Sequence, residues 1–120
     1  MTDTSASRRL CFLDTTRLQQ PLVDAVDVRT REDARIGRFD GVIVEPAERR
    51  VRYLVVDRGG RFIHHRYLMP LLPMRVDSDH HALRLEVDDV EADEWQAFDP
   101  RSFPEFTDDD LITAMFAQRS

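Results

Sequence analysis

Between residues 23 and 89 the sequence alternates short apolar runs with turn residues, and no helical pattern intervenes. The clearest run, Val51 to Val56, is rich in the β-branched and aromatic residues typical of strands. The run from Leu83 to Val87 alternates strictly between apolar and polar residues, which indicates one buried and one wet face. About five or six short strands joined by tight turns predict a mainly β fold, a small antiparallel barrel.

The remaining strands are expected around Val26 and Val28, from Arg35 to Val44, and from Phe62 to Met69. Pro46 ends the second of these, and Pro70 with Pro73 ends the third, because proline cannot donate to a strand ladder. Asp57 to Gly60 is expected to be a turn, with its glycines free to adopt positive φ.

The chain divides into three parts. Residues 1–22 form an N-terminal arm with one short ordered piece around Leu10 to Leu13, residues 23–89 form the β domain, and residues 90–120 form an acidic C-terminal extension. Within the extension, Val90 to Phe98 is expected to form a short helical turn that carries Trp95.

A terminal helix is expected to begin at Thr107, with Asp110 three residues on in the position of a capping box. Three aspartates in the first turn also favour the positive end of the helix dipole. The apolar stripe that follows packs on the core or binds a partner, and the pattern leaves both open. The stripe consists of Leu111, Ile112, Met115 and Phe116.

Two runs, residues 42–44 and 53–56, are apolar on both faces of the expected strand. A small barrel buries only the inner face, so the outer one needs cover from the C-terminal extension, a second subunit or a partner. We expect a protein interface, and a homodimer in particular. The predicted interface residues are Leu54, Val56, Leu111, Ile112, Met115 and Phe116.

These residues together resemble the PRC-barrel family. The resemblance rests on the runs IGRFDGVIVEP at 36–46 and RVRYLVVDRGG at 50–60, and on Leu68-Met69-Pro70, and it covers about residues 22–89. Ala47-Glu48-Arg49, where glycine is frequent in the family, departs from the pattern, as does the histidine pair within Arg61 to Tyr67.

The resemblance implies a barrel used for binding rather than chemistry, with no catalytic residues and no cofactor to carry over. The family is similar to the cytoplasmic domain of the photosynthetic reaction-centre H subunit and to the C-terminal domain of a ribosome-maturation factor. Without the membrane helix of the first or the extra domain of the second, this chain is expected to be of the stand-alone bacterial type.

The residues suited to chemistry offer no reaction, so we expect no enzyme. Neighbouring residues of a strand point to opposite faces, so His64 and His65 cannot both bind one metal from a regular strand. One histidine of this pair could still meet one of His80 and His81 across neighbouring strands, with Asp77 or Asp79, but none of the usual short metal spacings is present. Surface or rim histidines are the favoured interpretation over metal ligands. Cys11 stands alone, without a flanking motif, and is expected to be inert. Nucleophile-elbow, zincin and phosphate-loop motifs do not occur.

Charge and composition narrow the classes of molecule that this chain is expected to bind. The net charge is −6, which disfavours nucleic acid, DNA in particular, and no apolar run is long enough to cross a membrane. The N-terminus lacks the apolar region of a secretory signal, so a cytoplasmic location is expected. All 17 basic residues are arginines, and they are scattered rather than clustered.

Three functional hypotheses follow, in order of preference. The first is a non-enzymatic protein-interaction or assembly module with a protein partner, itself a homodimer. The second is an accessory of RNA processing or ribosome maturation that acts through the scattered arginines, although RNA binding is disfavoured by the charge. The third is a histidine-dependent metal-binding protein.

Overall fold

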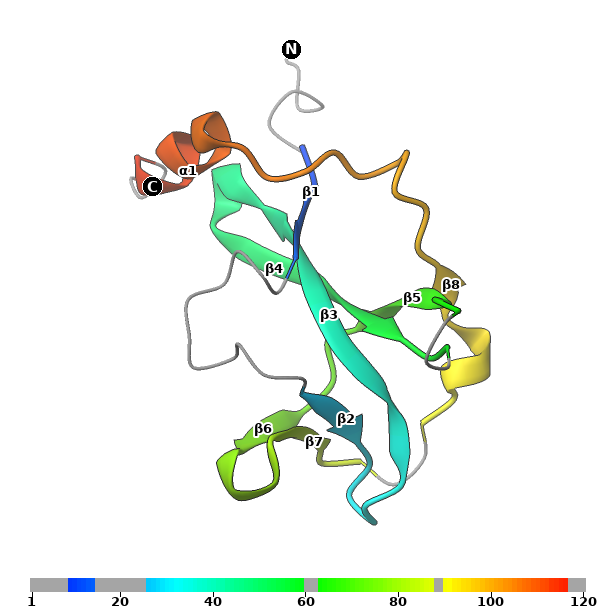
Figure 1. The fold of residues 1–120 in the computed structure, drawn as a ribbon. Helices are drawn as coiled ribbons and strands as arrows, with labels where there is room; N and C mark the ends of the chain where they lie inside the picture. Colours follow the sequence, from blue (N-terminus) through cyan, green and yellow to red (C-terminus); the bar gives the residue numbers. More distant parts are fainter. Residues whose placement is uncertain (1–8, 15–25, 60–62, 88–89, 117–120) are drawn as a thin grey trace.

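The computed structural model describes residues 9–14, 26–59, 63–87 and 90–116, which form one eight-stranded sheet, three 3₁₀ turns and an α-helix (Figure 1). The strands are β1 (Cys11–Asp14), β2 (Asp27–Arg29), β3 (Arg35–Glu45), β4 (Arg50–Asp57), β5 (Arg66–Pro70), β6 (Met74–Asp77), β7 (Ala82–Leu85) and β8 (Gln96–Ala97). The 3₁₀ turns are η3 (Pro46–Glu48), η4 (Ser78–His80) and η5 (Ala92–Glu94), and the helix is α1 (Asp108–Met115). The mainly β class with a C-terminal helix is confirmed.

The sheet is organised around β3, whose 11 residues reach three partners. β4 pairs with residues 38–45 on one edge, while β1 and β2 follow one another along the other edge, opposite residues 41–44 and 35–38. The strand order is β6-β7-β2-β3-β4-β5-β8, with β1 attached beside β3. The curled sheet thus ends at β6 and β8, and its closure into a cylinder stays a prediction.

One ladder departs from the expected antiparallel arrangement. β2 and β7 run parallel, with Asp27 opposite Ala82 and Arg29 opposite Arg84. Antiparallel pairing is typical of strands joined by a hairpin, whereas strands far apart in the chain can also meet in parallel. The expectation of a purely antiparallel sheet was therefore wrong at this ladder.

Strand boundaries follow the prediction where hydrophobic runs are long and depart from it near the prolines. The ordered piece expected in the arm is confirmed as β1, and Glu45-Pro46 ends β3 as predicted. β5 starts at Arg66 rather than Phe62, and Pro70 is its last residue, opposite Tyr53. β6, which follows Pro73 and pairs with β7, was not predicted, nor was the two-residue β8.

The main core lies on one face of the sheet and joins β4 and β5 to β2, β3 and β7. Leu54 and Val56 belong to it and are only 6% and 0% exposed, which corrects the expectation that they face an interface. The reason is strand alternation, which turns both side chains inward from β4. The other buried members are Val26, Val28, Phe39, Met69, Leu83 and Leu85.

A second core lies on the opposite face of β4 and β5. It contains Ile43, Val55, Leu68 and Phe98, with Phe12 among the residues packed against it. The two-faced apolar runs are therefore covered within the chain, by β1 and by the C-terminal extension around residues 98–106. The sequence left open what covers the outer apolar face of β4, and the structure shows that β1 and the C-terminal extension do.

A β-bulge in β3 lets one strand serve both cores. Phe39 pairs with Val56 and Gly41 with Val55, so Asp40 is the extra residue. The bulge reverses the alternation, which places Phe39 in the main core and Ile43 in the second. The Asp40 carboxylate pairs with Arg66 of β5.

Candidate interaction surface

Helix α1 is held in place at its N-terminus. Thr107 accepts a hydrogen bond from the Asp110 backbone N–H at 3.2 Å, and the Asp110 carboxylate accepts one from the Thr107 N–H at 2.9 Å, which confirms the predicted capping box. Arg9, which precedes β1, donates from Nε and Nη2 to the two oxygens of the Asp110 carboxylate, at 2.7 and 3.2 Å. These bonds lower the pKa of Asp110 well below its usual range, and the bond from Arg9 has the largest effect. Burial alone would raise this pKa, but the hydrogen bonds outweigh it.

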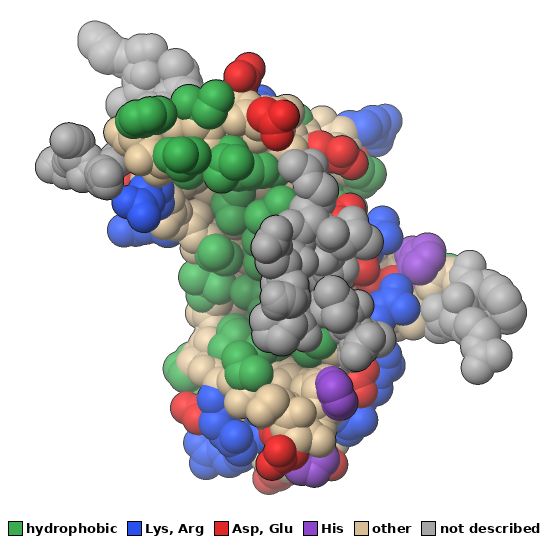
Figure 2. All heavy atoms as spheres, turned by 60° about the vertical axis from the view of Figure 1, so that its left-hand side comes forward, with side chains coloured by type: hydrophobic (Ala, Val, Ile, Leu, Met, Phe, Trp, Pro, Cys, Tyr) green, Lys and Arg blue, Asp and Glu red, His purple; other side chains and the backbone are tan. Residues whose placement is uncertain are grey.

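The apolar stripe of α1 points to the surface. Its members Leu111, Ile112, Met115 and Phe116 are 48%, 52%, 59% and 74% exposed, and Asp110 is the buried residue of the helix. Of the two interpretations that the pattern allowed, packing on the chain's own core is wrong for these side chains among the described residues. Figure 2 shows hydrophobic side chains gathered at this end of the molecule.

The surroundings of the stripe carry charges of both signs. Helix α1 lies beside η3, at the hairpin that joins β3 to β4 (Figure 1). Arg49 and Arg50 follow η3, and within the described part of the chain neither has a carboxylate within ion-pair distance. Asp108 and Asp109 in the first turn of α1 are likewise exposed, with no ion pair to a described residue. We call α1 with Arg49 and Arg50 the α1 surface.

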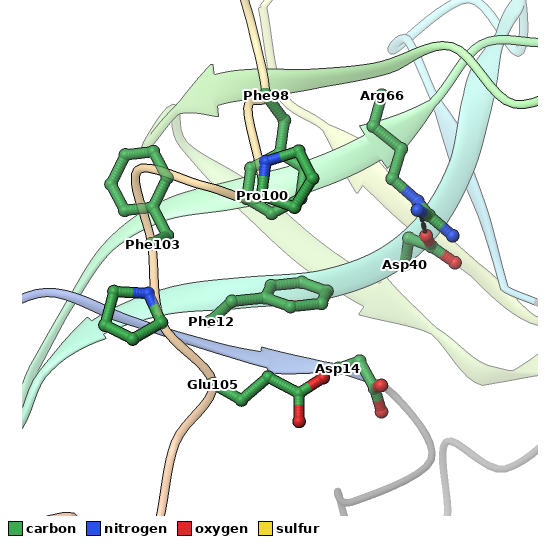
Figure 3. Close-up of a pocket in the computed structure, with 9 residues that line it drawn as sticks. Phe12, Asp14, Asp40, Arg66, Phe98, Pro100, Phe103 and Glu105 are labelled. Carbon is green, nitrogen blue, oxygen red and sulfur yellow. Dashed lines mark hydrogen bonds and ion pairs between the residues drawn. The ribbon is translucent and has the colours of Figure 1, made fainter.

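A pocket of about 430 Å³ opens on the outer side of the second core. Its walls include Phe12 of β1 with Phe98 and Phe103 of the extension (Figure 3). The ring centroids of Phe12 and Phe98 are 4.9 Å apart, and those of Phe98 and Phe103 are 5.8 Å apart. The three rings thus form a continuous aromatic wall. We call this cavity the β1 pocket.

Charged groups line the β1 pocket beside the aromatic wall. Asp14 and Glu105 lie on one side of the Phe12 ring, and Asp40 lies across the pocket, where it accepts a hydrogen bond from Arg66 Nε (Figure 3). The described part of the lining thus holds three carboxylates and one guanidinium.

Backbone contacts fix the position of the pocket residues. Phe12 N–H donates to Pro104 C=O and Phe106 N–H donates to Phe12 C=O, both at 2.9 Å, so the extension runs parallel to β1 at Glu105. Close approach of β1 to β3 depends on Gly41, where a Cβ would lie 2.6 Å from the Phe12 ring. The pocket is thus built on paired strands.

The histidines lie at separate loops. His64 Nδ1 is 2.6 Å from Asp57 Oδ2, whereas His80 Nδ1 is 3.0 Å from Asp77 Oδ1, and no group of three potential metal ligands occurs in the described ranges. His65 and His81 are exposed, and His81 ends η4 with a φ of 52°. The structure therefore does not bring the two pairs together.

Asp57 closes the loop between β4 and β5. Its buried carboxylate, 3% exposed, accepts from the backbone N–H groups of Gly59 and His65 at 2.9 and 3.1 Å and lies against His64. Burial raises its pKa, but the hydrogen bonds from His64, Gly59 and His65 outweigh burial, and the net shift is downward. These contacts give Asp57 a role in shaping the loop.

Cys11 is buried in β1 beside the Arg9–Asp110 pair. Burial, followed by the nearby Asp110 carboxylate, raises its pKa to about 11. The side chain is therefore a neutral thiol near neutral pH, as expected for an inert cysteine.

Sequence reasoning missed the β1 pocket altogether. Its residues come from β1, β3, β5 and the extension, so no local spacing links them. The aromatic residues at 98 and 103, with prolines at 100 and 104, were the available sign.

Comparison with known proteins identifies one family. No curated protein matches the chain. No helix among the described residues has the length and apolar character that crossing a membrane requires. The PRC-barrel domain matches residues 25–93, which is more than half of the 120 residues and contains β2 to β7. With the sheet just described, this match shows that the chain belongs to the PRC-barrel domain family.

Proposed function

We propose that this protein is a non-enzymatic interaction module of the cytoplasm, which assembles as a homodimer through the α1 surface. The observation that carries the proposal is a firmly held helix with four large apolar side chains 48–74% exposed. Exposed apolar residues that are scattered singly are ordinary, but a contiguous stripe on one short helix is typical of an interface.

The fixed position of the helix supports a role for the α1 surface in binding. The Arg9–Asp110 pair and the capping box fix the first turn before any partner arrives. Binding then costs less entropy than it would if the helix had to be ordered in the complex.

A second copy of the chain is the occupant that the charges favour. Two-fold pairing places the same patch on both sides of the interface, so the patch must complement itself. The α1 surface does so, because its apolar stripe lies near two arginines and two aspartates with no ion pairs to other described residues. The exposed Val51 at the same hairpin extends the apolar area, which an eight-residue helix alone would leave small for a stable dimer.

The alternative of RNA binding finds less support in the arrangement of the arginines. Most of the described arginines face carboxylates, which competes with phosphate binding. Those in ion pairs are Arg9, Arg29, Arg35, Arg38, Arg52, Arg58, Arg66, Arg75, Arg84 and Arg101.

The test is analytical ultracentrifugation of the full chain over a wide concentration range. Wild type is expected to sediment as a dimer, and Phe116→Asp as a monomer. The matched control is Val76→Asp, because Val76 on β6 is 64% exposed yet distant from α1, and this variant should remain dimeric. Both variants should keep the far-UV circular dichroism of wild type, since each change lies at the surface, and only Phe116→Asp should melt at a lower temperature, because it loses the stabilisation that the dimer gives. A wild-type monomer at every concentration, or equal dissociation by both variants, would contradict the proposal.

A further inference from the structure

A second pocket, of about 390 Å³, opens at the start of β4, next to the hairpin that joins β3 to β4. Val51, Tyr53 and Leu71 give it apolar walls, and Val51 and Leu71 are 37% and 51% exposed. Arg50 and Arg52 complete the described part of the lining, which contains no carboxylate. We call this cavity the hairpin pocket.

The two arginines of the hairpin pocket differ in their surroundings. Arg52 Nη1 is 3.5 Å from Glu45 Oε1, so a charge of opposite sign already faces it. Arg50 is exposed and has no carboxylate within ion-pair distance among the described residues. The pocket therefore offers an unmatched positive charge beside an apolar surface. Such a site is complementary to a segment in which an acidic residue is followed by apolar side chains.

Helix α1 presents a segment of this kind on its exposed face. Asp108 comes three and four residues before Leu111 and Ile112, so the three residues lie on one face of the helix. The buried Asp110, two residues on, lies on roughly the opposite face, where it binds Arg9. Asp108 is exposed and forms no ion pair with any described residue. The exposed face thus begins with a free carboxylate and continues with the apolar stripe.

Helix and pocket lie at the same end of the molecule but do not pair within one chain. Helix α1 lies beside η3, which directly precedes Arg50 at the hairpin. Figure 2 shows basic side chains next to the hydrophobic ones at this end. The stripe nevertheless stays 48–74% exposed. Two-fold pairing of this end of the molecule brings the helix of each copy to the pocket of the other, because every contact in such an interface occurs twice.

We propose that the hairpin pocket is the docking site for helix α1 of a second copy of the chain. Asp108 of that copy pairs with Arg50, and its apolar stripe covers Val51 and Leu71. The inference rests on the proposed homodimer and specifies how its two subunits meet, through two identical contacts between helix and pocket. Packing of α1 against α1 would instead leave Arg50 unmatched and the apolar walls of the pocket in water.

Charge reversals test this arrangement by analytical ultracentrifugation of the full chain. Arg50→Glu and Asp108→Arg should each weaken the dimer by roughly tenfold or more, because each change places like charges at both contacts. An equimolar mixture of the two variants should restore the wild-type dissociation constant, since both contacts of the mixed dimer again join opposite charges. Rescue by mixing also excludes unfolding as the cause of dissociation. The matched control is Arg101→Glu, at an arginine whose side chain is 91% exposed outside both surfaces, and it should dimerise like wild type.

A change in the wall of the pocket leaves α1 itself intact. Leu71→Asp should dissociate the dimer as Phe116→Asp does, because it places a carboxylate against the apolar stripe of the second copy. Val76→Asp is again the control, since Val76 is 64% exposed and lies outside the pocket. Far-UV circular dichroism should be the same for both variants and wild type, because both side chains are at the surface.

Two results would overturn this inference and leave the homodimer in place. The first is a dimeric wild type whose mixed charge-reversal variants stay monomeric. The second is a dimer that Phe116→Asp dissociates but that neither Arg50→Glu nor Leu71→Asp weakens. A wild-type monomer at every concentration would overturn both this inference and the proposed function.

Discussion

Arg9 and Asp110 are 101 positions apart in the sequence, yet the guanidinium of one binds both oxygens of the other's carboxylate. The Asp110 side chain is 7% exposed and also caps α1 through Thr107. An isolated helix of eight residues is not stable in water, so tertiary contacts must hold it. This pair therefore ties the N-terminal strand to the C-terminal helix.

Replacement of Asp110 by Asn should destabilise the chain by about 1–2 kcal/mol, because it weakens both the cap and a charge-assisted bond. Urea unfolding at neutral pH measures the loss. The control Asp109→Asn, in the same helical turn but exposed, should change the free energy of unfolding by less than about 0.5 kcal/mol. A double-mutant cycle with Arg9→Met should give a coupling of about 0.5–1 kcal/mol, since Arg9 is 45% exposed. Zero coupling would contradict the conclusion that the Arg9–Asp110 pair stabilises the chain.

Asp57→Ala should destabilise the chain by about 2–3 kcal/mol, because it leaves the backbone N–H groups of Gly59 and His65 without their acceptor. Thermal and urea unfolding measure the effect. Asp93→Ala is the control, since that carboxylate pairs with Arg58 but is 96% exposed, and its loss should have little effect. Equal effects of the two changes would refute the proposed role of Asp57 in the loop.

Acid should weaken the fold through Asp77. Arg84 and then His80 lower its pKa from 3.8 to about 2. The unfolded state therefore binds protons first, so the stabilisation is present above pH ~4 and is lost as the pH falls toward 2. Urea unfolding at a series of pH values should show a decline that is shallower in Asp77→Asn than in wild type. Parallel curves for the two proteins would contradict this.

Cys11 should resist thiol reagents in the folded protein. Its side chain is 0% exposed, so a reagent cannot reach the sulfur. Its pKa is about 11, so little of the reactive thiolate is present at pH 8. Reaction with Ellman's reagent at pH 8 should be slow in buffer and rapid in urea, and the signal is unambiguous because the chain has one cysteine. The Asp110→Asn variant should react faster than wild type if the pair with Arg9 holds β1 in place. Rapid labelling of the folded wild type would contradict the burial.

Local patterns accounted for the elements whose residues are neighbours in sequence. Thr107 and Asp110 predicted the capping box, and the run from Val51 to Val56 predicted β4, because caps and strand alternation are short-range effects. β6 escaped notice because Pro73 directly precedes it, and its pairing with β7 supplies the stability that its own sequence does not indicate. The parallel contact of β2 with β7 has no local sign at all.

The sequence by itself determined the mainly β class, the family resemblance, the helix start at Thr107 and the apolar stripe behind it. Only the tertiary structure decided that Leu54 points inward, that Phe116 points outward, and that Phe12 pairs with Glu105 beside the β1 pocket. The reason is physical. Periodicity tells which residues of one element share a face, whereas the packing of distant elements decides whether that face is covered, and by what.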